Sequence, residues 1–129
     1  KRIKESLFRN DKPLTIRMGN VDSQRDFVAV GDVADAYIKM VEGDCRGEVY
    51  NVCSGKPFSI RRIVELIASY SNIAVEIVHD PALVRCQDVP VSFGSYAKAN
   101  RDFGFVPGTD IETEIAEAWR YYMEQASEA

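Results

Sequence analysis

Apolar and polar positions along the chain alternate in a few short stretches, which indicates extended structure. Side chains of alternating polarity predict a strand over 14–18, and β-prone apolar runs predict extended chain over 27–30 and 73–78. The strongest strand signal covers 48–53, between two glycine-containing turns. The sequence therefore predicts three or four short strands.

Helical periodicity accounts for most of the remaining chain. Apolar residues recur at helical spacing over 2–10, 33–42, 60–71, 96–103 and 111–125. The expected N-caps are Asp32, Ser59, Ser95 and Asp110, and the expected terminating glycines are Gly43 and Gly104. The faces expected to be buried are Ala34, Tyr37, Ile38 and Val41 in the second helix, Ile60, Ile63, Val64 and Ile67 in the third, and Ile111, Ile115, Ala118, Trp119 and Tyr122 in the last.

This order of strands and helices predicts an α/β or α+β fold with four to five helices. The segment 80–91 contains two prolines and shows no clean period, so we expect an ordered loop there. Three or four short strands are too few for a self-standing doubly wound sheet. We therefore expect residues 1–129 to form one lobe of a larger enzyme.

Composition narrows the classes of partner. The 129 residues carry a net charge of -4, which disfavours nucleic acid and anionic membranes as partners. Three cysteines without a C-x-x-C pair and a single histidine, His79, offer no zinc ligand set, so no metal site is expected. No apolar run is long enough to span a bilayer, and residues 1–10 lack the apolar segment of a signal peptide, so we expect a cytoplasmic protein.

Any anion site in an acidic chain must be local, and two arginines are the best candidates for one. Arg25 and Arg85 could bracket a diphosphate, because a guanidinium donates paired hydrogen bonds to phosphate oxygens and stays charged. Asp88 could accept a hydrogen bond from a ribose hydroxyl. The alternative is that both arginines are surface charges paired with Asp26 and Asp88. Composition alone favours that alternative.

Two motifs of nicotinamide enzymes are absent from the sequence. It contains neither a glycine-rich dinucleotide-binding turn nor a Tyr-x-x-x-Lys pair. We therefore expect no catalytic residue and no cofactor-binding residue within these 129 positions.

Five short motifs in order carry a family resemblance over nearly the whole chain. They are Gln24-Arg25-Asp26-Phe27-x-x-Val30-x-Asp32-Val33, Gly47-Glu48-Val49-Tyr50-Asn51-Val52-Cys53-Ser54-Gly55, Ser59-Ile60, Arg85-x-x-Asp88-Val89-Pro90 and Gly104-Phe105-x-Pro107. Together they resemble the C-terminal part of the extended short-chain dehydrogenase/reductase family, whose members include nucleotide-sugar epimerases, dehydratases and reductases. The branch most similar comprises GDP-mannose 4,6-dehydratase and GDP-4-keto-6-deoxy-mannose reductase, and Phe27 after Arg-Asp favours the reductase side.

The resemblance reverses the preference on the arginines and implies roles for named residues. It implies that Arg25 and Arg85 bind the diphosphate of a sugar nucleotide and that Asp88 binds the ribose. It places Met18, Gly19, Asn20 and Val21 beside the base. It also implies that Phe27 packs under the ribose or phosphates, while Tyr50, Asn51 and Ser54 lie where the cofactor domain meets this lobe.

The resemblance further implies an incomplete enzyme. A Rossmann domain upstream would hold NADP and the catalytic Ser/Thr, Tyr and Lys, and the strand–helix unit over 48–71 would join it. The expected partners are a GDP-sugar and a second copy of the chain in a homo-oligomer such as a dimer. By itself the lobe would be inactive. Two alternatives remain open at this point, a stand-alone nucleotide-sugar binding module and an oligomerisation fragment without catalysis.

Overall fold

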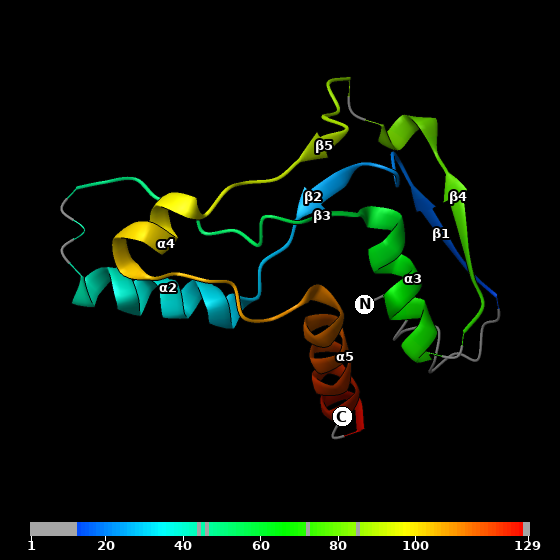
Figure 1. Ribbon diagram of the computed structural model, residues 1–129. Coiled ribbons are helices and arrows are strands. Elements are labelled where there is room, and N and C mark those ends of the chain that lie inside the picture. The colour runs from blue at the N-terminus through cyan, green and yellow to red at the C-terminus, as the bar shows by residue number, and fades with distance from the viewer. Residues whose placement is uncertain (1–12, 44, 46, 72, 85, 128–129) are drawn as a thin grey trace. The chain divides into compact units, whose positions relative to one another are not determined.

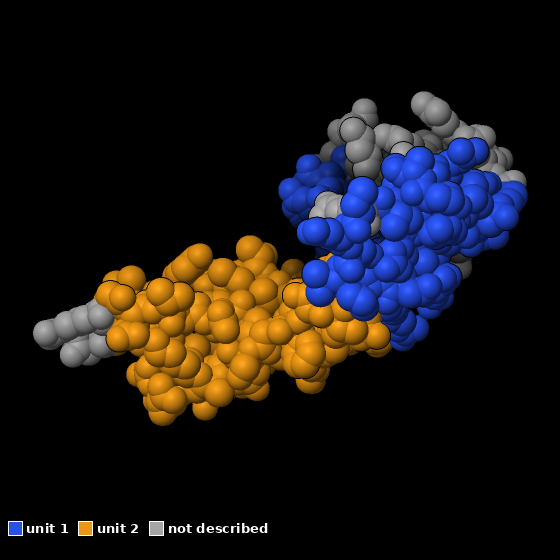
Figure 2. Space-filling view, turned by 90° about the horizontal axis from the view of Figure 1, so that it is seen from above, with its two compact units in different colours: residues 1–23, 59–90, 115–129 blue, residues 24–58, 91–114 orange. Residues whose placement is uncertain are grey.

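The computed structural model describes residues 13–127 except 44, 46, 72 and 85, so the helix expected over 2–10 lies outside the described residues. The chain divides into two compact units. The first unit comprises residues 1–23, 59–90 and 115–129, and the second comprises residues 24–58 and 91–114 (Figure 2). We describe each unit by itself.

The first unit contains a parallel pair of strands and a helix. Strand β1 (Leu14–Met18) pairs with β4 (Val75–His79), so that Leu14 lies opposite Val75 and Met18 opposite His79 (Figure 1). The side chains of β1 alternate between half-buried and exposed, which confirms the predicted strand. Helix α3 (Ile60–Ser71) contributes the buried Leu66.

Local capping in the first unit follows the sequence prediction. The Ser59 hydroxyl accepts a hydrogen bond from the backbone N–H of Arg62 at 3.1 Å, which is the N-cap contact expected for α3. The loop after β4 begins with a 3-10 turn, η1 (Pro81–Leu83). Asp80 precedes this turn, and its carboxylate accepts from the N–H of Ala82 at 3.0 Å. The loop expected over 80–91 thus begins with an ordered 3-10 turn.

The second unit is built around a short strand, β2 (Gln24–Asp26). It lies between β3 (Pro57–Ser59) and β5 (Val91–Ser92), and it runs parallel to β5. The extended run expected at 27–30 is therefore three residues earlier. Helix α2 (Val30–Glu42) begins where that run was expected to end.

The expected N-cap of α2 is wrong. The N-cap residue is Ala29, and Asp32 lies in the first helical turn, where it is buried. Its carboxylate accepts from the backbone N–H groups of Gly108 and Thr109, each at 3.1 Å. A tertiary contact with a distant turn outcompetes the local capping geometry for this side chain.

The buried face of α2 is also opposite to the one predicted. Tyr37, Ile38 and Val41 are 62, 55 and 86% exposed, whereas Ala36 is completely buried. Ala36 packs with Ala99 and Phe105 into the core of this unit, with Met40, Tyr50, Val52, Tyr96 and Phe103 around them. Within the described residues, the more apolar face of α2 has no core to join.

The strand expected over 48–53 does not form in the described part of the chain, where this segment has no regular structure. A strand is defined by its ladder of hydrogen bonds to a neighbour. The side chain of Val49 is 83% exposed, as expected for an extended segment on a surface. Residues 48–53 thus have a strong strand pattern but stay irregular, because no described strand pairs with them.

The last two helices match their predicted ranges closely. Helix α4 (Ala97–Phe103) ends at Gly104, whose φ of 72° lies in the left-handed region. Its N-cap is Tyr96 rather than Ser95. Helix α5 (Ile111–Ser127) begins after Asp110, whose carboxylate accepts from the N–H groups of Glu112 and Thr113.

The predicted inward face of α5 is right in part. Ile115 is buried, and Ile111 and Trp119 are half-buried, but Ala118 and Tyr122 are exposed. The described residues thus form a mixed α/β structure with four α-helices and few strands, which confirms the predicted fold class. Across these residues, every helix is too short or too polar to cross a membrane.

Candidate functional site

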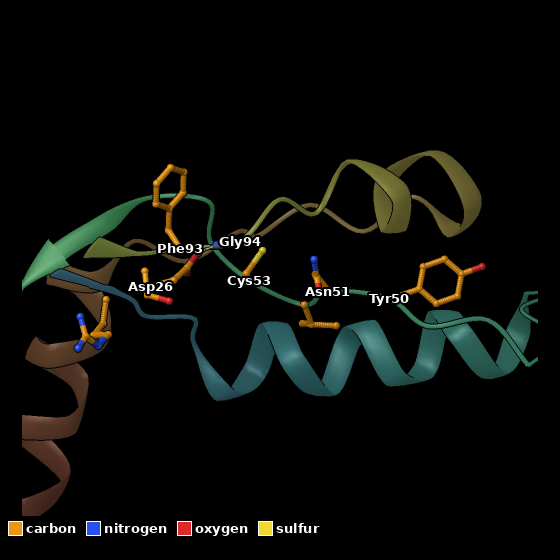
Figure 3. A pocket seen from close by; sticks show the side chains of 9 residues that line it. Asp26, Tyr50, Asn51, Cys53, Phe93 and Gly94 are labelled. Atoms are coloured by element: carbon orange, nitrogen blue, oxygen red, sulfur yellow. Dashed lines mark hydrogen bonds between the residues drawn. The ribbon is translucent and has the colours of Figure 1, made fainter. Parts of the chain in front are cut away.

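One cavity lies entirely within residues of the second unit. Its volume is about 520 Å³, and Figure 3 shows its lining side chains. They are Arg25, Asp26, Tyr50, Asn51, Val52, Cys53, Ser92, Phe93 and Gly94. The cavity thus gathers the Arg-Asp pair of β2, the irregular segment 50–53 and the residues that follow β5.

Asp26 holds these three segments together. Its Oδ1 atom accepts hydrogen bonds from the backbone N–H and the hydroxyl of Ser54, at 2.7 and 2.6 Å. Its Oδ2 atom accepts from the N–H of Gly55 at 3.0 Å and from the N–H of Gly94 at 3.1 Å. A carboxylate has about four acceptor positions, and four donors fill them here. Asp26 is therefore a structural centre of the cavity wall.

This network affects the ionisation of two cavity residues. Burial by itself raises the pKa of Asp26, but the hydrogen bonds from Ser54, Gly94 and Gly55 outweigh burial and lower that pKa. Burial also raises the pKa of the Cys53 thiol, and the negative charge of Asp26 raises it further. A thiol with a raised pKa stays protonated, so Cys53 is a poor nucleophile.

Arg25 lies at the same cavity and is half-buried. Its Nη1 atom donates to the carbonyl oxygen of Gln24 at 2.7 Å. Ser54, Gly55 and Gly94 fill the acceptor positions of the Asp26 carboxylate. A guanidinium that lines a cavity of this size is within reach of an anion bound there.

Tyr50 and Lys98 approach each other but do not form an acid–base pair. The ammonium of Lys98 lies over the Tyr50 ring, 4.4 Å from its centroid, and also binds Glu48 at 2.7 Å. Burial, followed by hydrogen bonds to Cys45 and Asp102, raises the pKa of Tyr50 to about 12. A proton donor or base for catalysis near neutral pH needs the opposite shift. The contacts of this cluster are those of a structural element of the fold.

Two further predicted site residues meet in the first unit. The side-chain amide of Asn20 donates to Oδ2 of Asp88 at 2.6 Å. Gly19 precedes this contact and packs so tightly against the η1 turn that an added Cβ would lie 2.4 Å from the carbonyl oxygen of Leu83. Val21 is 5% exposed, and its carbonyl accepts from the N–H of Arg61, so its side chain belongs to the core.

The remaining predicted site residues are placed as follows. Phe27 is half-buried and lines a second cavity of about 210 Å³ in the second unit, together with Phe58 and Tyr96. Arg85 lies outside the described residues. His79, the single histidine of the sequence, is exposed at the end of β4.

Sequence reasoning treated Asp26 only as a possible partner of Arg25 and overlooked Gly94. An added Cβ at Gly94 would lie 2.7 Å from the sulfur of Cys53, so only glycine fits there. No local spacing indicates either role, because the contacts join distant segments. In the described part of the chain, acidic, histidine and cysteine side chains form no cluster that could hold a metal ion.

Comparisons with known proteins identify a family model and relatives that match most of this chain. The family model for GDP-mannose 4,6 dehydratase matches residues 5–118. The chain is 35% identical to GDP-6-deoxy-D-mannose reductase of Pseudomonas aeruginosa over 114 residues, which are 88% of this chain and 36% of the relative. It is 33% identical to GDP-6-deoxy-D-talose 4-dehydrogenase of Aggregatibacter actinomycetemcomitans over 87 residues, 67% of this chain and 30% of that relative.

Solved structures show the same relationship. The structure of RMD from Pseudomonas aeruginosa complexed with NADPH matches with a TM-score of 0.78 and 30% identity, over 94% of this chain and 40% of that one. UDP-glucose 4-epimerase of Thermotoga maritima with UDP-glucose matches with a TM-score of 0.80 and 25% identity, over 96% of this chain and 38% of that one. The chain thus spans well under half the length of these relatives. By sequence and by fold, it belongs to the GDP-mannose 4,6-dehydratase family, within the extended short-chain dehydrogenase/reductase enzymes that act on nucleotide sugars.

Proposed function

We propose that this chain binds a GDP-sugar as the substrate-binding part of an NADP-dependent GDP-4-keto-6-deoxy-mannose reductase or GDP-mannose 4,6-dehydratase. The observation that carries the proposal is that Arg25 lines the 520 Å³ cavity, in a chain whose family model is that of GDP-mannose 4,6 dehydratase. In this proposal Arg25 and Arg85 bind the diphosphate and Asp88 accepts from the ribose. Gly19, Asn20, Val21 and Phe27 complete the surroundings of the nucleotide.

Of the two reactions, the relatives favour reduction. The two GDP-sugar relatives described above carry the names of a 6-deoxy-mannose reductase and a 6-deoxy-talose 4-dehydrogenase, both of which indicate redox chemistry on a GDP-6-deoxy sugar. When bound, NADPH would supply the hydride that such a reduction needs. The residues of this chain would supply binding energy from the nucleotide, which orients the sugar at the reacting carbon.

We place the cofactor site outside these 129 residues. The sequence has no glycine-rich dinucleotide turn and no Tyr-x-x-x-Lys pair. The segment 48–53, which pairs with no strand in the described part of the chain, is proposed with α3 to join the sheet of a cofactor-binding domain. Its strand-like sequence and the exposure of Val49 support this assignment.

Calorimetry with GDP-mannose tests the binding proposal. We expect the wild-type chain to bind and Arg25→Ala or Arg85→Ala to lower affinity by about tenfold or more, since each removes a charged hydrogen-bond donor to phosphate. Arg120→Ala removes an exposed arginine of α5 and serves as the matched control, with unchanged affinity expected. Equal affinities for wild type and the Arg25 variant would overturn the proposed role of that residue.

A turnover assay tests where the chemistry resides. We expect the chain alone, mixed with GDP-mannose and NADP, to give no product and no change in nicotinamide absorbance. Product formation by the chain would contradict the placement of catalytic residues elsewhere. The same assay with a stand-alone nucleotide-sugar binding module would also be negative, so calorimetry and turnover must be read together.

A further inference from the structure

Asn20 is held by three hydrogen bonds, and the third reaches Asp88. Its Oδ1 atom accepts from the backbone N–H of Asp22 at 3.1 Å, and its carbonyl oxygen accepts from the hydroxyl of Ser23 at 3.0 Å. A backbone N–H can only donate, so the oxygen of the carboxamide must face Asp22. The nitrogen then faces Asp88, where Nδ2 donates to Oδ2 at 2.6 Å.

The turn that carries Asn20 is fixed on the side of helix α3. The N–H of Ile60 donates to the carbonyl of Ser23 at 3.1 Å, and the N–H of Arg61 donates to the carbonyl of Val21 at 2.8 Å. The Nε atom of Arg61 binds the Asp22 carboxylate at 2.9 Å. Val21 and Ser23 are buried. The first turn of α3 therefore sets the position of residues 21–23.

The same turn is fixed on the side of the loop that carries Asp88. The N–H of Asp80 donates to the carbonyl of Met18 at 2.8 Å. Gly19 packs on the backbone of Leu83, as described above. Asn20 thus reaches Asp88 from a turn that is fixed on both sides, and Asp88 follows the η1 turn in the same loop.

We infer that Asn20 is a positioning residue, which holds the Asp88 carboxylate so that it accepts hydrogen bonds from the ribose hydroxyls of a nucleoside diphosphate. The inference rests on the proposed function, because it assigns Asp88 to the ribose. It gives Asn20 a task other than direct contact with the base. The donor capacity of a carboxamide suits this task, since an aspartate at position 20 would turn a second acceptor toward Asp88.

The experiment compares GDP with its dideoxyribose analogue, which lacks both ribose hydroxyls. Asn20→Asp keeps an acceptor for the N–H of Asp22 but removes the donor to Asp88, and Asn20→Ala removes both. We expect either variant to weaken GDP binding about tenfold, in line with the loss of one hydrogen bond to a charged group, and to change binding of the analogue less than twofold. Gln125→Ala, an exposed carboxamide in α5, is the control and should change neither affinity.

If GDP and its analogue lose affinity equally, or if neither loses any, Asn20 does not act through the ribose and the inference fails, while the proposed function stands. If the wild-type chain binds no GDP, the proposed function and this inference fall together. Asp88→Asn should reproduce the selective loss, and Asn20→Asp in that background should add little further, because the two residues act as one unit.

Discussion

The carboxylate of Asp26 accepts a hydrogen bond from the backbone N–H of Gly94 at 3.1 Å, although 68 positions separate the two residues. The same carboxylate binds Ser54 and Gly55. These contacts bring the residues after β5 and the segment before β3 to the β2 strand. The cavity that Arg25 lines therefore depends on one half-buried acceptor.

Replacing Asp26 should destabilise the second unit. Asp26→Asn turns an amide N–H₂ toward groups that are themselves donors, so about half of the contacts are lost, and we expect a loss of about 2 kcal/mol in the free energy of unfolding. Urea denaturation followed by circular dichroism measures it. Asp35→Asn, the same change at an exposed position of α2, should leave stability within about 0.5 kcal/mol of wild type. Equal effects of the two variants would contradict the central role of Asp26.

Stability should fall on acidification through the titration of Asp26. Its folded pKa lies below the ordinary value of 3.8, so the folded state favours the charged carboxylate. The resulting stability is fully present above pH 3.8 and is lost as pH falls through the folded pKa. Asp22 and Asp110 shift in the same direction. Urea midpoints measured between about pH 5 and about pH 2 should therefore decrease, and less steeply in Asp26→Asn. Identical slopes in both proteins would assign the acid sensitivity to other carboxyls.

Two glycines should respond oppositely to alanine. At Gly19 an added Cβ would lie 2.4 Å from the carbonyl oxygen of Leu83, so the backbone must move, and we expect a loss of about 1–3 kcal/mol. At Gly31, in the first turn of α2, an added Cβ meets nothing within 4 Å. Gly31→Ala should therefore stabilise the protein by up to about 1 kcal/mol through helix propensity. Thermal unfolding of both variants checks the pair, and a neutral Gly19→Ala would show that the η1 turn yields easily.

The exposed face of α2 should bind a hydrophobic dye. This face consists of Val30, Ala34, Tyr37, Ile38 and Val41. We expect the chain to enhance the fluorescence of anilinonaphthalene sulfonate, and Ile38→Lys with Val41→Glu to reduce that signal while changing stability by less than about 0.5 kcal/mol. Ala36→Glu, on the buried face of the same helix, should instead unfold the second unit. An unchanged dye signal in the double variant would show that the dye binds elsewhere.

Features that depend on neighbours in sequence were predictable. The caps by Ser59 and Asp110, the left-handed Gly104 and the alternation of β1 all require only contacts within a few residues. The motif series around Arg25 and Arg85 indicated the family, which the comparisons confirm. The roles assigned to individual site residues remain predictions.

The sequence by itself determined the presence of the four described helices, the caps by Ser59 and Asp110, and the family, because backbone hydrogen bonds and side-chain caps form locally. Tertiary structure alone decided which face of α2 is buried, since burial depends on what packs against a helix. It also decided that the pattern over 48–53 stays irregular, because a strand needs a partner. Tertiary structure also decided the contacts of Asp26, Asp32 and Asp88. These carboxylates accept hydrogen bonds from donors 28 to 77 positions away, and no local spacing in the sequence predicts such contacts.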